Sequence, residues 1–309
     1  MYDTIATRDM SREDWLKIRK AGIGGSDAGA VCGVNPYTSA MDIYYDKVTD
    51  DICLEDSEAM RQGRELENYV AERFCEATGF KVRRSSKMYR STEYPFMIAD
   101  VDRFVVGQDA GLECKTASAY NGDKWKDGRI PPHYLVQCLH YMAVTGKRAW
   151  YIAVVILGVE FKYVRIDWDE QLIENLIQVE KEFWNRHIIP GVLPAPDGSE
   201  ACDRILDKYF RKSGNGPAIR LEGFDEKLAR REELERQIKG LEKEQKQIDQ
   251  EIKLYMKDCE AAFNDSYRIT WKSVESLRLD TARLKKEIPE TYRDFSNVKV
   301  SRPFKVKAA

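Results

Sequence analysis

Two carboxylates and an ammonium group stand close together in the stretch from Asp102 to Lys115. The side chains of an extended strand alternate between its two faces, so Glu113 and Lys115 point in the same direction. A hairpin turn at residues 107–111, bounded by glycine on both sides, can bring Asp102 beside them. Such a convergence of charge is costly unless a cation uses it, and oxygen ligands of this kind suit magnesium or manganese. Two interpretations stay open at this point, a metal site and a surface salt bridge across a hairpin.

A third carboxylate, Glu67, falls within a helix that the sequence predicts from about residue 57 to residue 78. At helical spacing it shares a face with the apolar residues Val70, Ala71 and Phe74. A glutamate on an apolar face is unusual. Either it is aimed at the cation that the first two carboxylates would hold, or the phase of the helix is misjudged.

A glycine-rich turn near the N-terminus, Gly22-Ile-Gly24-Gly25-Ser26, precedes the start of another helix. Such a turn exposes N–H groups to an anion, and Ser26 adds a hydroxyl. Arg19, one turn upstream, can supply a forked donor for phosphate. The motif is weak by itself, because glycine-rich turns are common and most bind nothing.

Gln137 and Tyr141 form a polar pair one helical turn apart, so they share a face of their helix. The pair fits a functional site and equally fits a buried hydrogen-bonded pair.

Composition limits the class of protein. With 309 residues, 43% hydrophobic and 33% charged, the chain can bury a full-sized core beside an appended unit. The seven cysteines are dispersed without a C-x-x-C pair, which predicts free thiols and argues against zinc or an iron–sulfur cluster. We find no secretion signal, and the longest apolar run, residues 149–159, is too short for a bilayer. These features predict a soluble, cytoplasmic protein without a membrane partner. The net charge of -2 neither supports nor excludes nucleic acid.

The order of helical and strand patterns predicts a mixed α/β core from residue 11 to about residue 194. We expect helices at about 57–78, 132–145 and 169–186, and strands near 81–89, 96–106, 112–117, 149–157 and 161–166.

The composition changes after residues 190–196, and we divide the chain into a core (1–200) and a C-terminal extension (201–309). Residues 224–259 are highly charged, with apolar residues in heptads that Gly240 and Gln245 weaken. This pattern fits a long amphipathic helix on its own domain or a seam between copies of the chain. The tail predicts a strand, a helix and a strand at 267–271, 281–294 and 304–306.

Taken in order, the motifs resemble those of the PD-(D/E)xK nucleases, and more narrowly the YqaJ-type viral recombinase exonucleases, relatives of phage lambda exonuclease. The likeness covers about residues 15–166. One departure is that Val101 precedes Asp102 where the family motif has proline, which leaves Asp100 as a competitor for the metal role. The motifs are Arg19-Lys-Ala-Gly-Ile-Gly-Gly-Ser26, Gly63-x-x-x-Glu67, Asp102, Glu113-Cys114-Lys115 and Gln137-x-x-x-Tyr141.

The resemblance implies a restriction-endonuclease-like core, a mixed sheet flanked by helices. It also implies a metal-dependent 5′→3′ exonuclease that resects linear double-stranded DNA to 5′-mononucleotides and leaves a 3′ single strand. Asp102 and Glu113 would hold Mg2+, or Mn2+, with the backbone carbonyl of Cys114 as a further ligand. Glu67 would complete the shell, directly or through water, and Lys115 would orient the attacking water or stabilise charge.

The resemblance gives the other motifs two roles, support of the catalytic residues and recognition of the DNA end. Gln137 would fix Lys115 or the nearby backbone, with Tyr141 packed behind it. Arg19 and Ser26, with the backbone of Gly24 and Gly25, would bind the 5′-terminal phosphate.

The stretch from residue 120 to residue 129 mixes cations with an aromatic ring, which predicts a loop that contacts DNA through Lys124, Trp125 and Arg129. A solvated loop with Trp125 in the core fits equally well.

The resemblance implies three kinds of partner: double-stranded DNA ends, a single-strand annealing protein and further copies of the chain, as in a trimeric ring. Two rival functions stay open. One is an endonuclease or single-strand nuclease of the same fold, and the other is a catalytically silent DNA-binding protein.

Overall fold

The computed structural model describes residues 1–52, 57–214 and 216–307. Contacts divide the chain into two units after Phe210. Helix α7 (Glu200–Phe210) lies in the part predicted to form the C-terminal extension, but it packs on helix α3 (Ala40–Val48). The Tyr209 ring stacks on Tyr45 with centroids 3.7 Å apart, which places α7 in the first unit.

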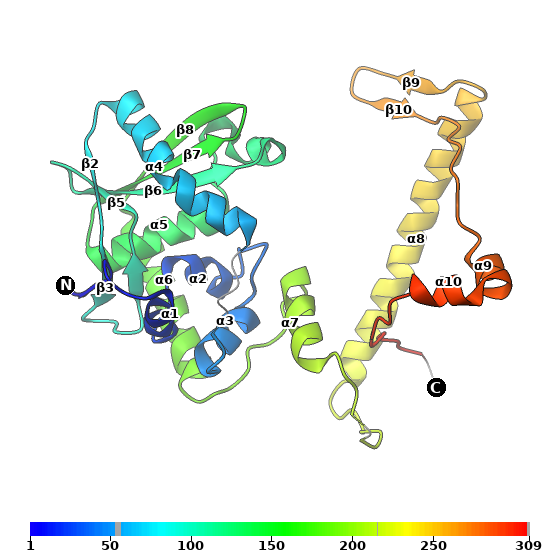
Figure 1. The fold of residues 1–309 in the computed structure, drawn as a ribbon, viewed down its shortest axis with the longest axis horizontal. Coiled ribbons are helices and arrows are strands. Elements are labelled where there is room, and N and C mark those ends of the chain that lie inside the picture. The colour runs from blue at the N-terminus through cyan, green and yellow to red at the C-terminus, as the bar shows by residue number, and fades with distance from the viewer. Residues whose placement is uncertain (53–56, 215, 308–309) are drawn as a thin grey trace. The chain divides into compact units, whose positions relative to one another are not determined.

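A five-stranded sheet in the order β2-β5-β6-β7-β8 forms the centre of the first unit (Figure 1). β6 and β7 run parallel, and the other neighbours are antiparallel. The crossover between the two parallel strands contains the 3-10 helix η1 (Ala119–Gly128) and helix α5 (Pro132–Thr145). The strands are β2 (Val82–Arg84), β5 (Arg103–Val105), β6 (Ala110–Ala117), β7 (Ala149–Ile156) and β8 (Glu160–Asp167).

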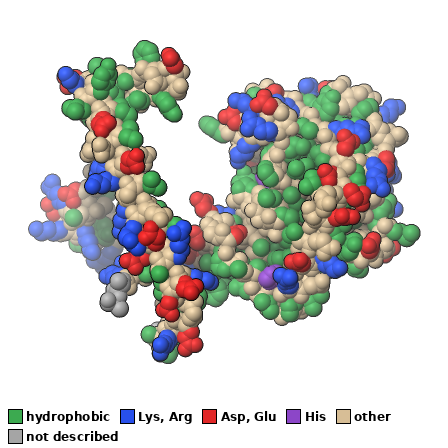
Figure 2. All heavy atoms as spheres, turned by 180° about the vertical axis from the view of Figure 1, so that it is seen from behind, with side chains coloured by type: hydrophobic (Ala, Val, Ile, Leu, Met, Phe, Trp, Pro, Cys, Tyr) green, Lys and Arg blue, Asp and Glu red, His purple; other side chains and the backbone are tan. Residues whose placement is uncertain are grey.

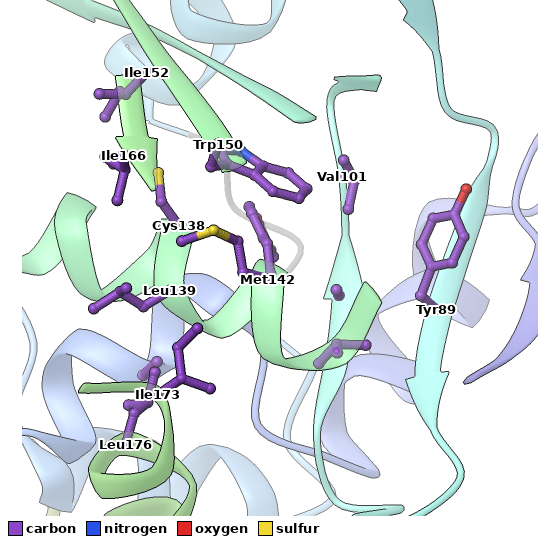
Figure 3. Packing of buried hydrophobic residues seen from close by; sticks show 14 of the residues in the cluster. Tyr89, Val101, Cys138, Leu139, Met142, Trp150, Ile152, Ile166, Ile173 and Leu176 are labelled. Carbon is purple, nitrogen blue, oxygen red and sulfur yellow. The ribbon is translucent and has the colours of Figure 1, made fainter. Parts of the chain in front are cut away.

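Two helices cover opposite faces of this sheet. β7 is buried along its whole length, so its residues alternate between two apolar faces. Tyr151 belongs to the cluster built with helix α4 (Glu58–Thr78), and its ring lies 5.2 Å from that of Phe74. Trp150 belongs to the cluster built with α5, where Cys138 and Met142 lie toward it and Leu139 lies toward Ile173 (Figure 3). The predicted α/β class, a mixed sheet flanked by helices, is confirmed.

A smaller antiparallel sheet in the order β1-β3-β4 joins the N-terminus to the core. Two stretches that the sequence predicts as single strands, 81–89 and 96–106, are each divided between the two sheets. The chain changes sheet at Ser85 and at Asp102, where the Ser85 N–H donates to the Asp102 carbonyl at 3.1 Å. The strands are β1 (Tyr2–Ala6), β3 (Lys87–Ser91) and β4 (Ile98–Asp100).

The predicted helix ends agree with the structure. Ser57 caps α4 by accepting from the N–H of Met60, and the helix stops at Gly79, whose φ of 72° is left-handed. α5 stops in the same way at Gly146 (φ 71°). Further helices of this unit are α1 (Arg12–Lys20), α2 (Gly25–Val31) and α6 (Glu170–Phe183), which continues into a π-helical turn at Trp184–Ile188.

The second unit contains the predicted long helix, α8 (Asp225–Met256), with charged side chains of both signs along it (Figure 2). A hairpin of β9 (Ala261–Phe263) and β10 (Arg268–Thr270) follows, and then α9 (Thr281–Glu287) and α10 (Pro289–Asp294). The prediction of one helix over 281–294 is wrong, because a proline at 289 restricts the residue before it. The strand predicted at 304–306 is absent, since no neighbouring strand pairs with it there.

In the part of the chain that the structure describes, no helix combines the length and the apolar character needed to span a bilayer.

Candidate functional site

The β5–β6 hairpin brings Asp102 beside Glu113. Its register pairs Arg103 with Leu112, so Asp102 and Glu113 occupy the next position of the two chains. The N–H of Cys114 donates to Oδ2 of Asp102 at 2.8 Å and fixes that carboxylate. The predicted convergence of the two carboxylates is therefore present.

Glu113 is 3% exposed, and its two oxygens differ in their surroundings. Oε1 accepts from Nζ of Lys115 at 2.6 Å and from Nε2 of Gln137 at 2.8 Å. Oε2 is buried, and within the described ranges it has no hydrogen-bond partner. A buried carboxylate oxygen in this state is costly, and a bound cation or water would satisfy it.

Lys115 keeps its charge at this site. Burial opposes the charged form, but Glu113 and Asp102 outweigh burial and raise the pKa of the Lys115 ammonium group. Its Nζ lies 4.6 Å from the ring centroid of Tyr134, a cation–π contact.

For Asp102, in contrast, the surroundings disfavour the ionised form. Burial raises its pKa well above the usual range, and the charges of Glu113 and Glu67 raise it further. Lys115 and the Cys114 N–H oppose these effects without cancelling them. The ionised form of Asp102 is thus disfavoured beside Glu113, and a divalent cation would relieve this penalty.

The donor set fits a metal ion that retains water ligands. Among the residues that the structure describes, no group of three His, Cys, Asp or Glu side chains forms a closed metal site. Asp102 and Glu113 supply two hard carboxylates, and a magnesium ion usually takes one or two carboxylates and keeps several waters. The Cys114 carbonyl stays a predicted further ligand.

Glu67 faces the core side of α4 as the helical phase predicts, but its nearest partner is a cation. Its Oε1 pairs with Nη1 of Arg103, and Nε of Arg84 lies 3.9 Å away. Arg103 is only 5% exposed, and it was not identified from the sequence. Its one signal in the sequence was its position in a mostly apolar strand segment. The role of Glu67 as a metal ligand stays a prediction.

Asp100 lies apart from this pair. It belongs to β4 in the smaller sheet, and its Oδ2 accepts from Nε1 of Trp15 at 2.8 Å. The structure thus places Asp102, and not Asp100, beside Glu113.

The resemblance implied that Gln137 would fix Lys115 or the nearby backbone. In the structure Gln137 bonds Glu113 instead. The physical reason is that an ammonium group only donates, and so does the amide nitrogen that faces it. The same Nε2 also donates to the hydroxyl of Tyr141 at 2.9 Å, which confirms that Tyr141 lies behind Gln137.

Arg19 and Ser26 meet as predicted. Nη2 of Arg19 donates to Oγ of Ser26 at 2.8 Å and to Oδ1 of Asp27 at 3.2 Å, and the guanidinium lies 4.9 Å from the Trp15 ring. They border a cleft of about 120 Å³, called here the terminal cleft, which reaches Gln137. The residues that line it are Trp15, Arg19, Gly24, Gly25, Ser26, Met88, Ile98, Asp100, Gln137 and Tyr141.

Asp27 and Lys47 hold Arg19 in place, and sequence reasoning missed both. Nζ of Lys47, fully buried, donates to Oδ2 of Asp27 at 2.8 Å and to the carbonyl of Arg19 at 3.0 Å. Burial alone would raise the pKa of Asp27, but Lys47 and Arg19 lower it to about 2. The Gly24 N–H donates to Asp27 at 3.0 Å, so the expectation that this N–H is free for an anion is wrong.

Trp125 is in the core, not on a DNA-contacting surface. It is 3% exposed and stacks on Tyr134 with centroids 5.8 Å apart. The indole fills space between η1 and α5, where burial of a large ring is favourable. Lys124 and Arg129 are exposed, so their contact with DNA stays a prediction.

Comparison with known proteins identifies the family. Residues 14–148 match the description "YqaJ-like viral recombinase domain". The YqaJ protein of Bacillus subtilis (strain 168) is 39% identical over 303 residues, which cover 97% of this chain and 95% of that protein. The chain belongs to the YqaJ-like viral recombinase family.

Solved structures agree with the fold of this YqaJ-family chain. The alkaline exonuclease LHK-Exo from Laribacter hongkongensis has a TM-score of 0.50 at 20% identity, over 64% of this chain and 99% of that one. A second structure of LHK-Exo, in complex with dAMP, also has a TM-score of 0.50, at 19% identity, over 64% and 97% of the two chains. The core therefore has the PD-(D/E)xK nuclease fold.

Proposed function

We propose that this YqaJ-family protein is a divalent-metal-dependent exonuclease that degrades linear double-stranded DNA from its 5′ ends. It releases 5′-mononucleotides and leaves a 3′ single strand. The observation that carries this proposal is the carboxylate of Glu113. One of its oxygens is held by Lys115 and Gln137, and the other is buried and unpartnered among the described residues, next to Asp102, whose pKa burial and neighbouring carboxylates raise.

Each residue of the site would have a separate role in phosphodiester hydrolysis. Asp102 and Glu113 would hold Mg2+ or Mn2+, with the Cys114 carbonyl and, through water, Glu67 as further groups. When bound, the ion acidifies a water and neutralises charge on the phosphate. Lys115 stays protonated, so its ammonium can orient the attacking water and stabilise the charge that develops on the phosphorane.

The terminal cleft supports attack at a 5′ end. Nη2 of Arg19 is used by Ser26 and Asp27, and a guanidinium has further donors for a phosphate. The cleft reaches Gln137, which bonds Glu113, so a 5′-phosphate held by Arg19 and Ser26 would lie next to the hydrolytic site. The dAMP in the LHK-Exo complex is a mononucleotide of the kind that this reaction would release.

A digestion experiment tests the reaction and its polarity. Linear duplex DNA is labelled separately at each 5′ and 3′ end, with either 5′-phosphate or 5′-hydroxyl, and a closed circle serves as the control. We expect loss of the 5′ label as mononucleotides, faster with 5′-phosphate, and an intact circle. Arg19→Ala with Ser26→Ala should remove the preference for 5′-phosphate.

The rival functions give different results in the same experiment. Internal cutting of the circle, with indifference to the changes at Arg19 and Ser26, would identify an endonuclease. Absence of cleavage with either metal would identify a DNA-binding protein with a silent site. A single-strand annealing partner, a trimeric ring and a cytoplasmic location stay predictions.

A further inference from the structure

Helix α5 carries the groups of the proposed site in order along its axis. Tyr141 lines the terminal cleft, and one turn earlier Gln137 bonds the carboxylate of Glu113. One further turn earlier, His133 and Tyr134 lie beside the site, with Tyr134 against the ammonium of Lys115. Each turn of an α-helix advances about 5 Å. The helix thus presents three successive positions to a DNA strand, beginning at the terminal phosphate.

Close contact with α2 fixes this order. A Cβ added at Gly25 would lie 2.5 Å from the Tyr141 ring, and one added at Gly29 would lie 2.9 Å from Cβ of His133. Glycine is therefore required at both positions, one turn apart on α2. The two helices cannot slide along each other, so the first and third positions keep their distance from the second.

An aromatic row continues from the third position to the surface. The rings of Tyr134 and His133 have centroids 4.0 Å apart, and Tyr37 meets His133 edge-on at 5.9 Å. Tyr37 lies on the loop between α2 and α3 and is 57% exposed. The row therefore begins at the ammonium of Lys115 and ends in solvent.

The row is uncharged but adjoins cations. Burial, together with the charges of Lys115 and Lys124, lowers the pKa of His133 to about 4, so its imidazole is neutral near pH 7. Its Nε2 is buried without a hydrogen-bond partner in the described part of the chain. Aromatic faces next to ammonium groups are the surface that binds bases and phosphates of a nucleic-acid strand.

We propose that Tyr37 and His133 form a binding subsite for the nucleotide on the 3′ side of the cleaved phosphodiester, with its base against the Tyr37 ring. The inference rests on the proposed function, because the terminal phosphate and the cleaved phosphate define the first two positions along α5. The nucleotide that follows the cleaved phosphate then reaches the third position. This subsite replaces Trp125 as the aromatic contact with DNA.

An abasic substrate tests the contact. Two 5′-phosphorylated duplexes are compared, one natural and one without the base of the second nucleotide from the 5′ end, and kcat/KM is measured for release of the first nucleotide. Stacking of one base predicts that Tyr37→Ala lowers kcat/KM roughly 5- to 150-fold on the natural duplex. It should leave the abasic duplex almost unchanged, and Tyr37→Phe should keep the wild-type values. Tyr267→Ala, which removes a ring 70% exposed just before β10 in the second unit, is the matched control and should have no effect.

Two outcomes would overturn the subsite. An equal loss on both duplexes would mean that Tyr37 acts without contacting that base, and no loss on the natural duplex would mean that it does not contact the substrate. Both results require a wild-type protein that cleaves, so neither would contradict the proposed exonuclease activity. A wild-type protein that does not cleave would instead contradict the proposed function itself.

Discussion

Nε2 of Gln137 lies 2.8 Å from Oε1 of Glu113, on a carboxylate whose other oxygen is buried and unpartnered within the described ranges. The amide and Lys115 together occupy one oxygen and leave the second for a ligand that the protein itself does not supply. This division orients Glu113 before any cation binds, which is how groups around a metal site tune its ligands.

Gln137→Ala should raise the Mg2+ concentration that cleavage requires, rather than disturb folding. Loss of a residue that orients a metal ligand typically costs 10- to 100-fold in affinity or activity, so we expect roughly that rise in the Mg2+ concentration for half-maximal cleavage. Tyr141→Phe keeps the amide on Glu113 and is the matched control, with a smaller effect. An unchanged Mg2+ requirement in Gln137→Ala would show that Glu113 needs no such support.

Asp102→Asn should stabilise the metal-free protein while abolishing cleavage. Because the folded state raises the pKa of Asp102, the wild-type protein loses stability as pH rises from about 3.8, the ordinary value, through that raised pKa. At neutral pH the buried acidic side chain therefore lowers the stability, and Asn, which does not ionise, removes this penalty. Thermal unfolding in EDTA should show a higher Tm for the variant, and Mg2+ should raise the Tm of the wild type alone.

Asp109→Asn is the control for that measurement. Lys147 and Arg148, the latter through its backbone N–H and its charge, lower the pKa of Asp109, so its removal should not stabilise the protein. A Tm of Asp102→Asn at or below that of the wild type in EDTA would contradict the claim that the folded protein disfavours the ionised form of Asp102.

Asp27→Asn should lower the free energy of unfolding at pH 7. The pKa of Asp27 is about 2 in the folded protein against an ordinary 3.8, so the ionised group adds about 2 kcal/mol above pH 4. That stability is lost as pH falls from 3.8 through 2. Urea unfolding at pH 7 and at pH 2 should show a deficit in the variant at pH 7 that shrinks in acid. The same deficit at both values would assign the effect to something other than ionisation.

The sequence predicted the parts of the site that depend on local pattern. Strand alternation placed Glu113 and Lys115 on one face, and helical spacing placed Gln137 with Tyr141. The partner of Gln137 and the burial of Trp125 depend on how α5 packs against the sheet, which periodicity does not encode. Asp27 and Lys47 meet between two helices, and Arg103 of β5 meets Glu67 of α4, so neither pair has a signal in sequence spacing. β1 escaped notice because its pairing with β3 is distant in the chain.

The buried pair of His140 on α5 and Glu180 on α6 should make the stability of the folded protein fall as pH rises. Nδ1 of His140 lies 2.7 Å from Oε1 of Glu180, and Nε2 lies 2.9 Å from the carbonyl of Ile98, with both side chains fully buried. Burial opposes the charge of His140, but Glu180 outweighs it and raises the pKa of the imidazole. Stability from this histidine is complete below about 6.5, the ordinary value, and is lost as pH rises through the raised pKa.

Two variants separate this pair from general damage to the core. His140→Leu leaves the Glu180 carboxylate buried without its partner, and breaking a buried pair in this way costs about 3–5 kcal/mol. The double variant His140→Leu, Glu180→Leu should recover part of that loss and unfold with less dependence on pH between 6.5 and 9. A double variant as unstable as the single one would argue against a coupled pair.

The most direct test of the account is the initial rate of 5′-label release, as mononucleotide, from a 5′-phosphorylated linear duplex. It is measured with Mg2+ and with EDTA, for the wild type and for Lys115→Ala, with DNA binding and the far-ultraviolet circular dichroism of both proteins recorded alongside. We expect Mg2+-dependent release by the wild type, and a folded, DNA-binding Lys115→Ala that releases no label. Release that continues in EDTA, or that survives in Lys115→Ala, would contradict the assignment of hydrolysis to Asp102, Glu113 and Lys115.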